Sequence, residues 1–561
     1  MRKYFFASLI FFSIVLLTFR AAGQNNLDEE YQPVRIYDLN DWISFKNSNH
    51  PTSLAVGKDF IYFGTTGGIV PYNFYSKRFA EPYSVSDGLV NDNIQAVYYD
   101  KNTDYLWAGH PGGISYLTPT GDQWIYLSAQ DVMSSANSIT SIGTYKDYIY
   151  AVASGGYIFR VSRIPGQLDY VPETNLSKLD IDWNISKNDP LPVINNYFFH
   201  PNKYELIKDG KIIGPELREF NVSLFYSDVR QNIYGGVWNL GLLTGDSNIQ
   251  TLALHPFGPL NNSINAITKI KNGFCLASSR SARSPERSGI TFFYPRDLEW
   301  EYVEPRFISG FPSQVINDVD YNNRQLWYAT NQGITINNRK NGGYHKLTVQ
   351  DGLIGEHIYT ISLEDSLAWV GSQLGLNLVY TGQYSVHRVH LTPDKFHTKI
   401  LKIKIGSKDV WIGTDNGLYS VNRDDHKVKH YDTFGEQIKL KQPVVSSYPA
   451  IATSDSLVIA YGYNSFLKHN LKKNEWSQLP DLPEVNIIYD LALYENYLWA
   501  GTDKGAFLIN LDNNSQEHYT KVDGLAGMHV YRVIIEDEDV WFGTNQGLTK
   551  YYWKKYAFTE N

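Results

Sequence analysis

Short apolar runs follow one another along almost the whole chain, and turns rich in Gly, Asn and Asp separate them. Runs of this length between tight turns are typical of β-strands rather than of helices. Gly112 and Gly113 lie between two such runs, where a tight hairpin needs a residue that adopts positive φ without steric cost. The surrounding segment predicts four antiparallel strands, at 94–97, 105–108, 114–117 and 123–127.

One eight-residue pattern recurs within these runs: an aromatic residue, any residue, Gly or Ala, Thr or Ser, two further residues, Gly and an apolar residue. Trp327, Trp369 and Trp411 begin three copies and are each 42 residues apart. Four short strands with their turns need about 40–45 residues, the length of one β-propeller blade. Eight clear copies begin at Tyr62, Trp107, Tyr150, Trp327, Trp369, Trp411, Trp499 and Trp541, and degenerate copies lie near Tyr197, Tyr234, Phe274 and Val458. The sequence therefore predicts an all-β fold of about twelve four-stranded blades.

The repeated aromatic residue and the small residue two positions later point to the same side of their strand. We expect that side to pack on the neighbouring blade, with the large and small side chains matched across the contact. The repeated Trp residues are therefore interpreted as packing residues rather than as platforms for sugar rings, because a core repeats in every blade and a ligand site does not.

Twelve blades are too many for one ring, so we expect two propellers in tandem, at residues 33–305 and 306–561. Seven blades plus five is the alternative division to six plus six. The insertion 280–288 stretches the spacing between Phe274 and Trp327 to 53 residues. Residues 34–45 resemble the outer strand of a blade, and we expect them to close a ring by pairing with a late segment, since closure removes exposed strand edges.

The N-terminus has the features of a secretory signal. Arg2 and Lys3 precede an apolar run, and small residues around Gly23 form a cleavage site, so residues 1–23 are expected to be removed. The alternative, a membrane anchor, is disfavoured because the run is shorter than the ~20 residues of a span. We expect a periplasmic or secreted protein whose mature chain holds no membrane span.

The charge of the chain disfavours one class of function, and its cysteine content indicates a buried residue. The net charge is −8, from 50 basic and 58 acidic residues, which does not resemble the basic surface of a nucleic-acid-binding protein. The single cysteine, Cys275, lies in an apolar run and is expected to be a buried small hydrophobic residue.

A longer form of the repeat resembles a known family. Asp-Gly-Leu, a polar stretch, an apolar strand and the Trp pattern follow one another from Asp87 to Trp107, from Asp351 to Trp369 and again before Trp541. This unit resembles the two-component regulator propeller repeat, which forms the periplasmic sensor of many hybrid histidine kinases, usually as two seven-bladed propellers. A related two-propeller architecture occurs in a component of the type IX secretion apparatus. The chain ends directly after its last repeat, without the Tyr-rich sandwich, span and kinase of the sensors or a sorting domain, so we expect a free-standing propeller.

No catalytic motif accompanies the repeats. The sequence lacks a nucleophile elbow, a zinc-protease helix motif, a phosphate loop and a cysteine-based zinc site. His387 and His390, with His397 nearby, form the densest histidine group, but residues three apart on a strand face opposite sides. The acidic run 536–539 lacks the spacing of a calcium loop and is expected at a hairpin turn. We therefore expect no enzyme activity, no metal and no cofactor.

The candidate ligand residues are Arg280, Arg283 and Arg287 in the insertion. Guanidinium groups bind carboxylates and sulfates through two hydrogen bonds, which suits an acidic sugar; a plain surface loop is the alternative. The resemblance implies a binding or sensing protein for a glycan or for a partner such as a sensor kinase. A component of a secretion or surface-assembly apparatus is the second hypothesis. A propeller lyase or glycosidase is the third.

Overall fold

The structure is a computed structural model that describes residues 37–557 apart from several gaps. The gaps are 122, 173–178, 193, 195, 202, 208–209, 215, 279–286, 312, 392–397, 432–433, 435–446 and 463–464. The predicted signal peptide, Arg280, Arg283 and His397 thus lie outside the described residues.

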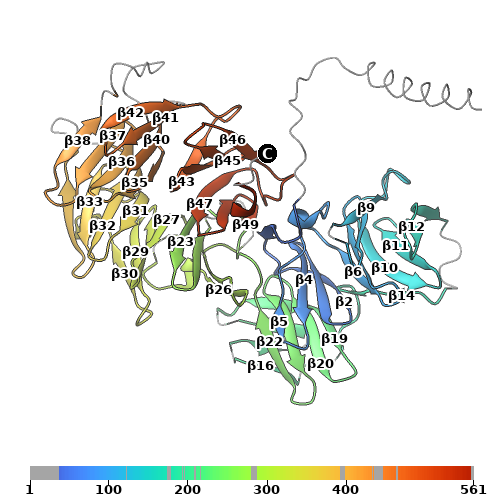
Figure 1. The fold of residues 1–561 in the computed structure, drawn as a ribbon. Helices are drawn as coiled ribbons and strands as arrows, with labels where there is room; N and C mark the ends of the chain where they lie inside the picture. Colours follow the sequence, from blue (N-terminus) through green and yellow to red (C-terminus); the bar gives the residue numbers. More distant parts are fainter. Residues whose placement is uncertain are drawn as a thin grey trace, which may run out of the picture. The chain divides into compact units, whose positions relative to one another are not determined.

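The described residues form eleven β-sheets, and seven of these belong to one ring (Figure 1). The strands of the ring are β23 (Ala266–Ile270), β24 (Gly273–Ala277), β25 (Ile290–Tyr294), β26 (Glu299–Val303); β27 (Ile316–Tyr321), β28 (Gln325–Thr330), β29 (Gly333–Asn338), β30 (Tyr344–Leu347); β31 (Ile358–Leu363), β32 (Leu367–Ser372), β33 (Leu376–Tyr380), β34 (Ser385–Val389); β35 (Ile400–Ile405), β36 (Asp409–Thr414), β37 (Gly417–Asn422), β38 (Val428–Tyr431); β39 (Ala450–Thr453), β40 (Leu457–Gly462), β41 (Ser465–Asn470), β42 (Glu475–Leu479); β43 (Ile488–Tyr494), β44 (Tyr497–Thr502), β45 (Gly505–Asn510), β46 (Gln516–Tyr519); and β47 (Val530–Ile535), β48 (Val540–Thr544), β49 (Gly547–Tyr551) with β1 (Trp42–Phe45).

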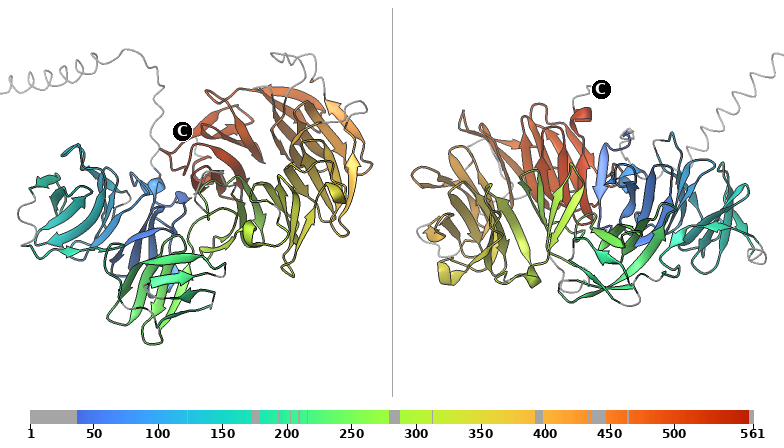
Figure 2. Two further views of the ribbon diagram at one scale, coloured as in Figure 1. Left: turned by 180° about the vertical axis from the view of Figure 1, so that it is seen from behind. Right: turned by 90° about the horizontal axis from the view of Figure 1, so that it is seen from below.

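The first strand of each ring sheet contacts the first strand of the next, from β23 to β47, and β47 contacts β23 again. The ring is therefore a closed seven-bladed propeller. Its last blade takes three strands from the C-terminal part of the chain and its outer strand, β1, from the N-terminal part. Figure 2 shows the blue β1 at the side of the red sheet, where Trp42 pairs with Tyr551 and Phe45 with Leu548. The predicted closure by the N-terminal segment is confirmed for residues 42–45.

The strand contacts do not place the boundary between the two groups of blades at residue 305, where it was predicted. Blade β23–β26 ends at Val303 but contacts β27 on one side and β47 on the other, so it belongs to the later ring. The division falls before β23, and the early residues 42–45 also belong to the later ring. The spacing misled the prediction, because the insertion 280–288 falls between β24 and β25 of one blade rather than between two propellers.

The other four blades form a smaller group. Its inner strands β2, β6 and β10 are neighbours in that order, and β19 lies on the other side of β2. The strands are β2 (Pro51–Val56), β3 (Phe60–Thr65), β4 (Gly68–Asn73), β5 (Arg78–Phe79); β6 (Ala96–Asp100), β7 (Tyr105–His110), β8 (Gly113–Leu117), β9 (Ile125–Ser128); β10 (Ile139–Tyr145), β11 (Tyr148–Ala153), β12 (Ile158–Ser162), β13 (Asp169–Val171); and β19 (Glu219–Ser227), β20 (Asn232–Val237), β21 (Gly241–Asp246), β22 (Thr251–His255).

Short strands join this group where a further blade was expected near Tyr197. They are β14 (Asp182–Trp183), β15 (Ile185–Ser186), β16 (Phe198–Phe199), β17 (Glu205–Leu206) and β18 (Lys211–Ile213). β14 pairs with the inner strand β10 and β15 with the inner strand β2, while β16, β17 and β18 extend the sheet of β19–β22. Among the described residues, the unit near Tyr197 therefore forms no separate sheet. The described helical turns are η1 (Val85–Asp87), η4 (Pro305–Phe307), η5 (Val349–Asp351) and α2 (Lys554–Ala557).

The repeated pattern forms the contact between successive blades, as predicted. Trp327 is buried in one cluster with Ile358 and Ile361 of the next blade. A Cβ added at Gly371, the small position of its blade, would lie 2.5 Å from Cγ2 of Ile400 in the following blade. Such a separation is far below a normal contact, so only glycine allows this approach.

The Thr of the pattern holds the hairpin that follows it. The hydroxyl of Thr330 donates to the carbonyl of Gly333 at 2.8 Å and accepts from the N–H of Gln332 at 3.1 Å. Thr414 and Thr544 make the same two bonds in their own blades. This pair of hydrogen bonds gives the hairpins of these blades the same geometry. In each, the Thr side chain bonds backbone groups of the turn that lack a backbone partner.

The Asp-Gly-Leu segments are also structural. Asp87 accepts the N–H of Ser84 at 2.8 Å, and Gly88 ends the short η1 turn at φ 93°. Thr348 and Asp351 form the same reciprocal cap at η5. These motifs are capping boxes that set the path of the chain between blades.

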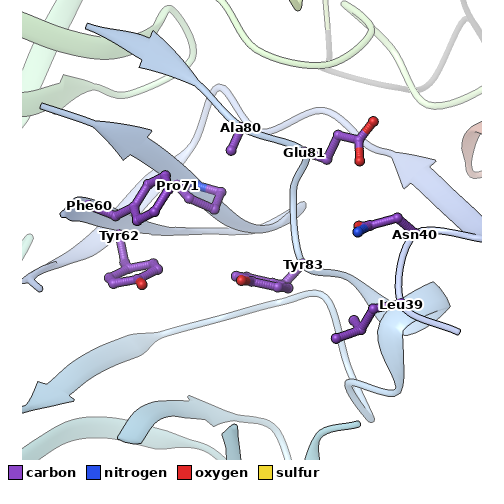
Figure 3. A pocket seen from close by; sticks show the side chains of 8 residues that line it. All are labelled: Leu39, Asn40, Phe60, Tyr62, Pro71, Ala80, Glu81 and Tyr83. Carbon is purple, nitrogen blue, oxygen red and sulfur yellow. The ribbon is translucent and has the colours of Figure 1, made fainter. Parts of the chain in front are cut away.

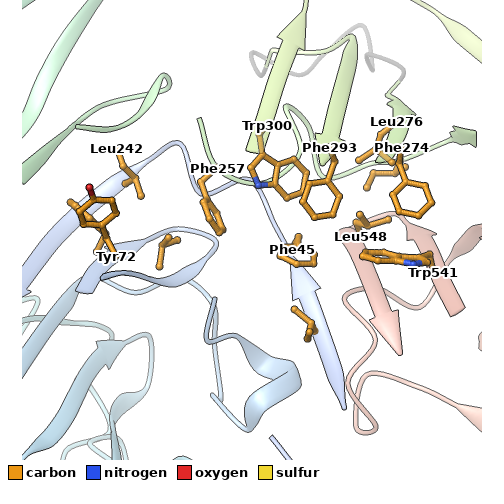
Figure 4. Packing of buried hydrophobic residues seen from close by; sticks show 14 of the residues in the cluster. Phe45, Tyr72, Leu242, Phe257, Phe274, Leu276, Phe293, Trp300, Trp541 and Leu548 are labelled. Atoms are coloured by element: carbon orange, nitrogen blue, oxygen red, sulfur yellow. The ribbon is translucent and has the colours of Figure 1, made fainter. Parts of the chain in front are cut away.

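A cluster of buried aromatic side chains lies around β1 (Figure 4). Phe293 and Trp300 stack with ring centroids 3.9 Å apart, and the ring centroid of Phe45 lies 5.1 Å from that of Phe293. Trp541 of the last blade and Tyr72 of β4 belong to the same cluster. Strand β1 therefore contributes to a core shared by the closing blade, the first ring blade and the smaller group.

Candidate functional site

Of the predicted ligand residues, only Arg287 lies within the described residues. It precedes β25, and its side chain is 10% exposed. Its Nε lies 2.7 Å from Oε1 of Glu304, and its Nη1 donates to the carbonyl of Asn239 at 2.9 Å. Its guanidinium also lies 5.7 Å from the centroid of the Tyr302 ring. Arg287 is thus an anchored, mostly buried side chain and not part of a free surface loop.

Glu304 gathers three arginines. Besides Arg287, it pairs with Arg306 at 2.7 Å and with Arg218 at 3.5 Å. Glu304 thus pairs with three guanidinium groups, and Glu216 also attracts Arg218. Burial lowers the pKa of Arg218.

Arg287 and Glu304 border the Arg287 cavity, a space of about 630 Å³, whereas Arg218 and Arg306 are not among its lining residues. This volume is within the range of about 300–1,000 Å³ typical of ligand sites. Aromatic and charged side chains alternate around it, and burial raises the pKa of Tyr204 on its wall. The lining residues are Phe199, His200, Pro201, Lys203, Tyr204, Glu216, Phe220, Leu240, Leu254, Pro256, Arg287, Trp300, Glu301, Tyr302, Val303, Glu304, Phe307, Ile308 and Tyr344.

A second cavity, of about 210 Å³, is lined by the inner strands of the ring. Two ion pairs cross it. Nζ of Lys402 lies 2.7 Å from Oδ1 of Asp490, and Nη2 of Arg532 lies 3.4 Å from Oδ1 of Asp318. Each pair joins blades that are separated by one blade, so the charges of this cavity neutralise one another across it.

The aspartates of this cavity also join neighbouring inner strands. Asp318 accepts the N–H of Ile361 at 3.2 Å, and Asp490 accepts the N–H of Val533 at 3.2 Å. Asp320 accepts the N–H of Leu363 at 2.8 Å. The inner strand is the edge of its sheet, so its outward N–H groups need partners other than a strand. These carboxylates provide them, which makes this charged cluster a structural one.

The electrostatic consequences follow from burial. Burial raises the pKa of Asp320 to about 6, because its partners are neutral N–H and O–H groups. Burial lowers the pKa of Lys402 to about 8. The pKa of Asp490 is well below its usual range, since the attraction of Lys402, Lys404 and Arg532 exceeds the effect of burial.

The other residues singled out from the sequence contact neighbouring side chains of the fold. His387 is exposed on β34, and its ring lies edge-on to that of Tyr380 at 5.4 Å. The acidic run 536–539 is at the predicted hairpin turn, where Asp539 pairs with Lys550 at 3.1 Å. Cys275 is completely buried, as predicted, and burial raises the pKa of its thiol to about 12. Across the described ranges, no three His, Cys, Asp or Glu side chains are grouped as metal ligands would be.

Sequence reasoning missed Glu304, Trp300 and Tyr204, which form the Arg287 cavity. Trp300 belongs to an outer strand and carries the same sequence signal as Trp residues that only pack between blades. Part of the cavity wall comes from Phe199 of β16 and from Tyr204, in a segment that no repeat predicts. In the part of the chain that the structure describes, no helix has the length and hydropathy needed to cross a membrane.

The fold defines a tandem β-propeller protein. No family model matches the sequence, and no curated protein matches it. Among solved structures, PorZ, an essential surface component of the type IX secretion system of Porphyromonas gingivalis, is 11% identical, with 91% of this chain and 87% of PorZ covered and a TM-score of 0.55. The extracellular domain of BT4673, a putative hybrid two-component system of B. thetaiotaomicron, is 13% identical, with 89% and 69% covered and a TM-score of 0.41. The likeness to PorZ shows a shared fold.

Proposed function

We propose that this protein is a non-enzymatic binding protein that works outside the cytoplasm and holds its ligand in the Arg287 cavity. The observation that carries the proposal is the composition of that cavity, in which aromatic side chains, Arg287, Lys203 and three glutamates line about 630 Å³. A few placed polar groups within an apolar wall are typical of a binding site.

The ligand class that these groups favour is an acidic oligosaccharide. Aromatic faces such as those of Tyr204 and Tyr344 suit sugar rings, and Arg287 and Lys203 suit a carboxylate or sulfate. Arg287 already has its geometry fixed by Glu304 and by the carbonyl of Asn239, so binding would cost little ordering of its side chain.

The test is calorimetric titration of the mature chain with uronic-acid oligosaccharides and with neutral oligosaccharides of equal length. We expect the acidic set to bind more tightly and the preference to weaken as salt is raised. Arg287→Gln should reduce affinity about tenfold or more, in line with the loss of a charged hydrogen bond. Lys203→Gln, at an exposed lining position, should give a smaller loss.

Arg296→Gln is the matched control, because Arg296 is exposed on the turn after β25 and does not border the cavity. Equal affinity for acidic and neutral oligosaccharides, or affinity that neither cavity variant changes, would contradict the proposal. Measurable hydrolysis or elimination of the same oligosaccharides by the purified chain would contradict its non-enzymatic part.

A role in a secretion or surface-assembly apparatus is the second candidate. The similarity to PorZ favours it, because one fold extends over 91% of this chain. In that case the protein should co-purify from the native envelope with membrane proteins in fixed proportion. Such complexes would form without added oligosaccharide, and Arg287→Gln would leave them intact.

A further inference from the structure

A third cavity, of about 200 Å³, lies in the smaller group of blades, far along the chain from Arg287 (Figure 3). We call it the Tyr62 cavity. Its volume is below the range of about 300–1,000 Å³ that suits drug-sized ligands, so its ligand would be a few heavy atoms in size. The lining residues are Leu39, Asn40, Phe60, Tyr62, Pro71, Ala80, Glu81 and Tyr83.

The β-ladder explains why aromatic side chains gather there. Phe60 and Tyr62 are two residues apart on β3 and therefore face the same side of the sheet, and Pro71 on β4 pairs opposite Tyr62. Tyr83 continues this surface, because its backbone exchanges two hydrogen bonds of 2.9 Å with Ile69 of β4. Figure 3 shows Phe60, Pro71 and Tyr62 at one end, Asn40 and Glu81 at the other, and Tyr83 between.

Neighbouring rings hold two of these walls in place. Tyr62 stacks on Tyr99 with centroids 6.0 Å apart and planes at 14°, and the Tyr99 hydroxyl donates to Asp104 at 2.9 Å. Tyr83 meets the buried Trp124 edge-on at 5.7 Å. Both rings are thus fixed from behind while half-exposed, so the cavity is preorganised.

The charge at the other end is negative. Glu81 is half-buried, and none of the eight lining residues is Lys or Arg. The nearby Lys550 already pairs with Asp539 at 3.1 Å. Burial raises the pKa of Glu81, and the attraction of Lys550 opposes this shift only in part. An acidic ligand would be repelled, and a sugar would find few hydrogen-bond donors.

We propose that the Tyr62 cavity binds a small organic cation, an alkylammonium or quaternary ammonium group. Aromatic faces attract such cations through their negative face, and a carboxylate beside them adds a direct charge partner. Phe60, Tyr62 and Tyr83 supply the faces, and Glu81 supplies the charge. The cation is held by its charge and by its size rather than by a pattern of hydrogen bonds.

The experiment compares choline with its neutral isostere 3,3-dimethylbutan-1-ol, by calorimetry or ligand-observed NMR on the mature chain. The two have the same shape and differ in charge. We expect choline to bind about tenfold or more tightly, the size of effect that cation–π and carboxylate attraction give together. Tetramethylammonium should bind as choline does, whereas phosphocholine should bind more weakly because of Glu81.

Two variants locate the site. Glu81→Gln keeps the side-chain shape and should reduce choline affinity about tenfold while leaving the isostere unchanged. Tyr83→Leu should weaken both. Glu299→Gln, exposed on another blade, is the matched control and should change neither.

Equal affinity for choline and the isostere would overturn the proposal, and this comparison uses the unmodified chain whether or not each variant folds. Choline affinity that Glu81→Gln does not change would overturn it too. So would the absence of saturable binding of choline and tetramethylammonium at millimolar concentrations. None of these outcomes bears on the Arg287 cavity, which lies elsewhere.

Discussion

Nζ of Lys402 lies 2.7 Å from Oδ1 of Asp490, although these residues belong to blades separated by the blade β39–β42. In their own blades both residues pair with the small residue of the repeat, Gly413 and Gly501. The skipped blade has Ile451 at this position, opposite Ala460. The ion pair therefore passes a blade that has an apolar residue at the position where its two neighbours have charged ones.

Lys402→Met should destabilise the protein strongly. The change leaves the Asp490 carboxylate buried without its cation, and breaking such a pair costs about 3–5 kcal/mol. Urea unfolding of the purified chain measures the loss. The double variant Lys402→Met/Asp490→Leu removes both charges and should recover most of the free energy; a double variant as unstable as the single one would show that the ion pair is not the cause.

Asp320 should add stability as pH falls from 7 toward 5, whereas His255, whose pKa burial lowers to about 4, should remove stability over the same range. The folded-state pKa of Asp320, about 6, is above its ordinary value of 3.8, so the folded protein binds this proton more tightly than the unfolded chain. This group contributes about 1 kcal/mol of stability at pH 5 that is lost as pH rises through 6. Asp87, with its pKa raised to about 7, contributes in the same direction. The free energy of unfolding of the unmodified chain minus that of Asp320→Asn should therefore increase as pH falls from 7 to 5; Asp455→Asn, at an exposed position, is the control.

Gly371→Ala should destabilise by about 1–3 kcal/mol, because the new methyl group would overlap Ile400 across the contact between blades. Gly382→Ala is the matched control, since no atom lies within 4 Å of a Cβ added there. Thermal unfolding of the two variants side by side tests this. Similar melting temperatures would mean that the blades can separate to accommodate the methyl group.

Trp42→Ala should weaken the closing blade. The Trp42 ring stacks on Tyr551 with centroids 3.9 Å apart and is almost completely buried, and truncations of this kind cost about 3–5 kcal/mol. Hydrogen exchange should then increase in β49 more than in β33. Trp183→Ala, at a 38% exposed position on β14, should leave both strands protected; faster exchange spread evenly over all blades would contradict a local closing role.

The repeat made the blades and their contacts predictable, because Trp327, Gly371 and their equivalents do the same packing work in every copy. The turn-forming Thr and the capping Asp-Gly-Leu segments are local in sequence and appear in the pattern for that reason. The division between propellers was not predictable from spacing, since the insertion lies inside a blade. The ring order depends on which inner strand neighbours which, a non-local property.

The candidate sites were harder to predict for a related reason. Arg287 was singled out by composition, but its partner Glu304 and the wall residue Tyr204 come from segments without any repeat. The Tyr62 cavity uses a copy of the repeat whose aromatic residue is Tyr rather than Trp. In the sequence, Tyr at this position is a conservative replacement of Trp. Only the fold brings Tyr62 and Glu81 to the same cavity.

Strand β1 affects when the ring can close during synthesis of the chain. The hydroxyls of Ser44 and Thr549 lie 3.0 Å apart, yet 505 residues separate them in the chain. A ribosome makes β1 long before β49, so the closing blade of the ring forms only after β49 has emerged. Until then β1 lacks its partner strand, and its edge is exposed to unwanted pairing. The ring can therefore close only once synthesis has passed β49.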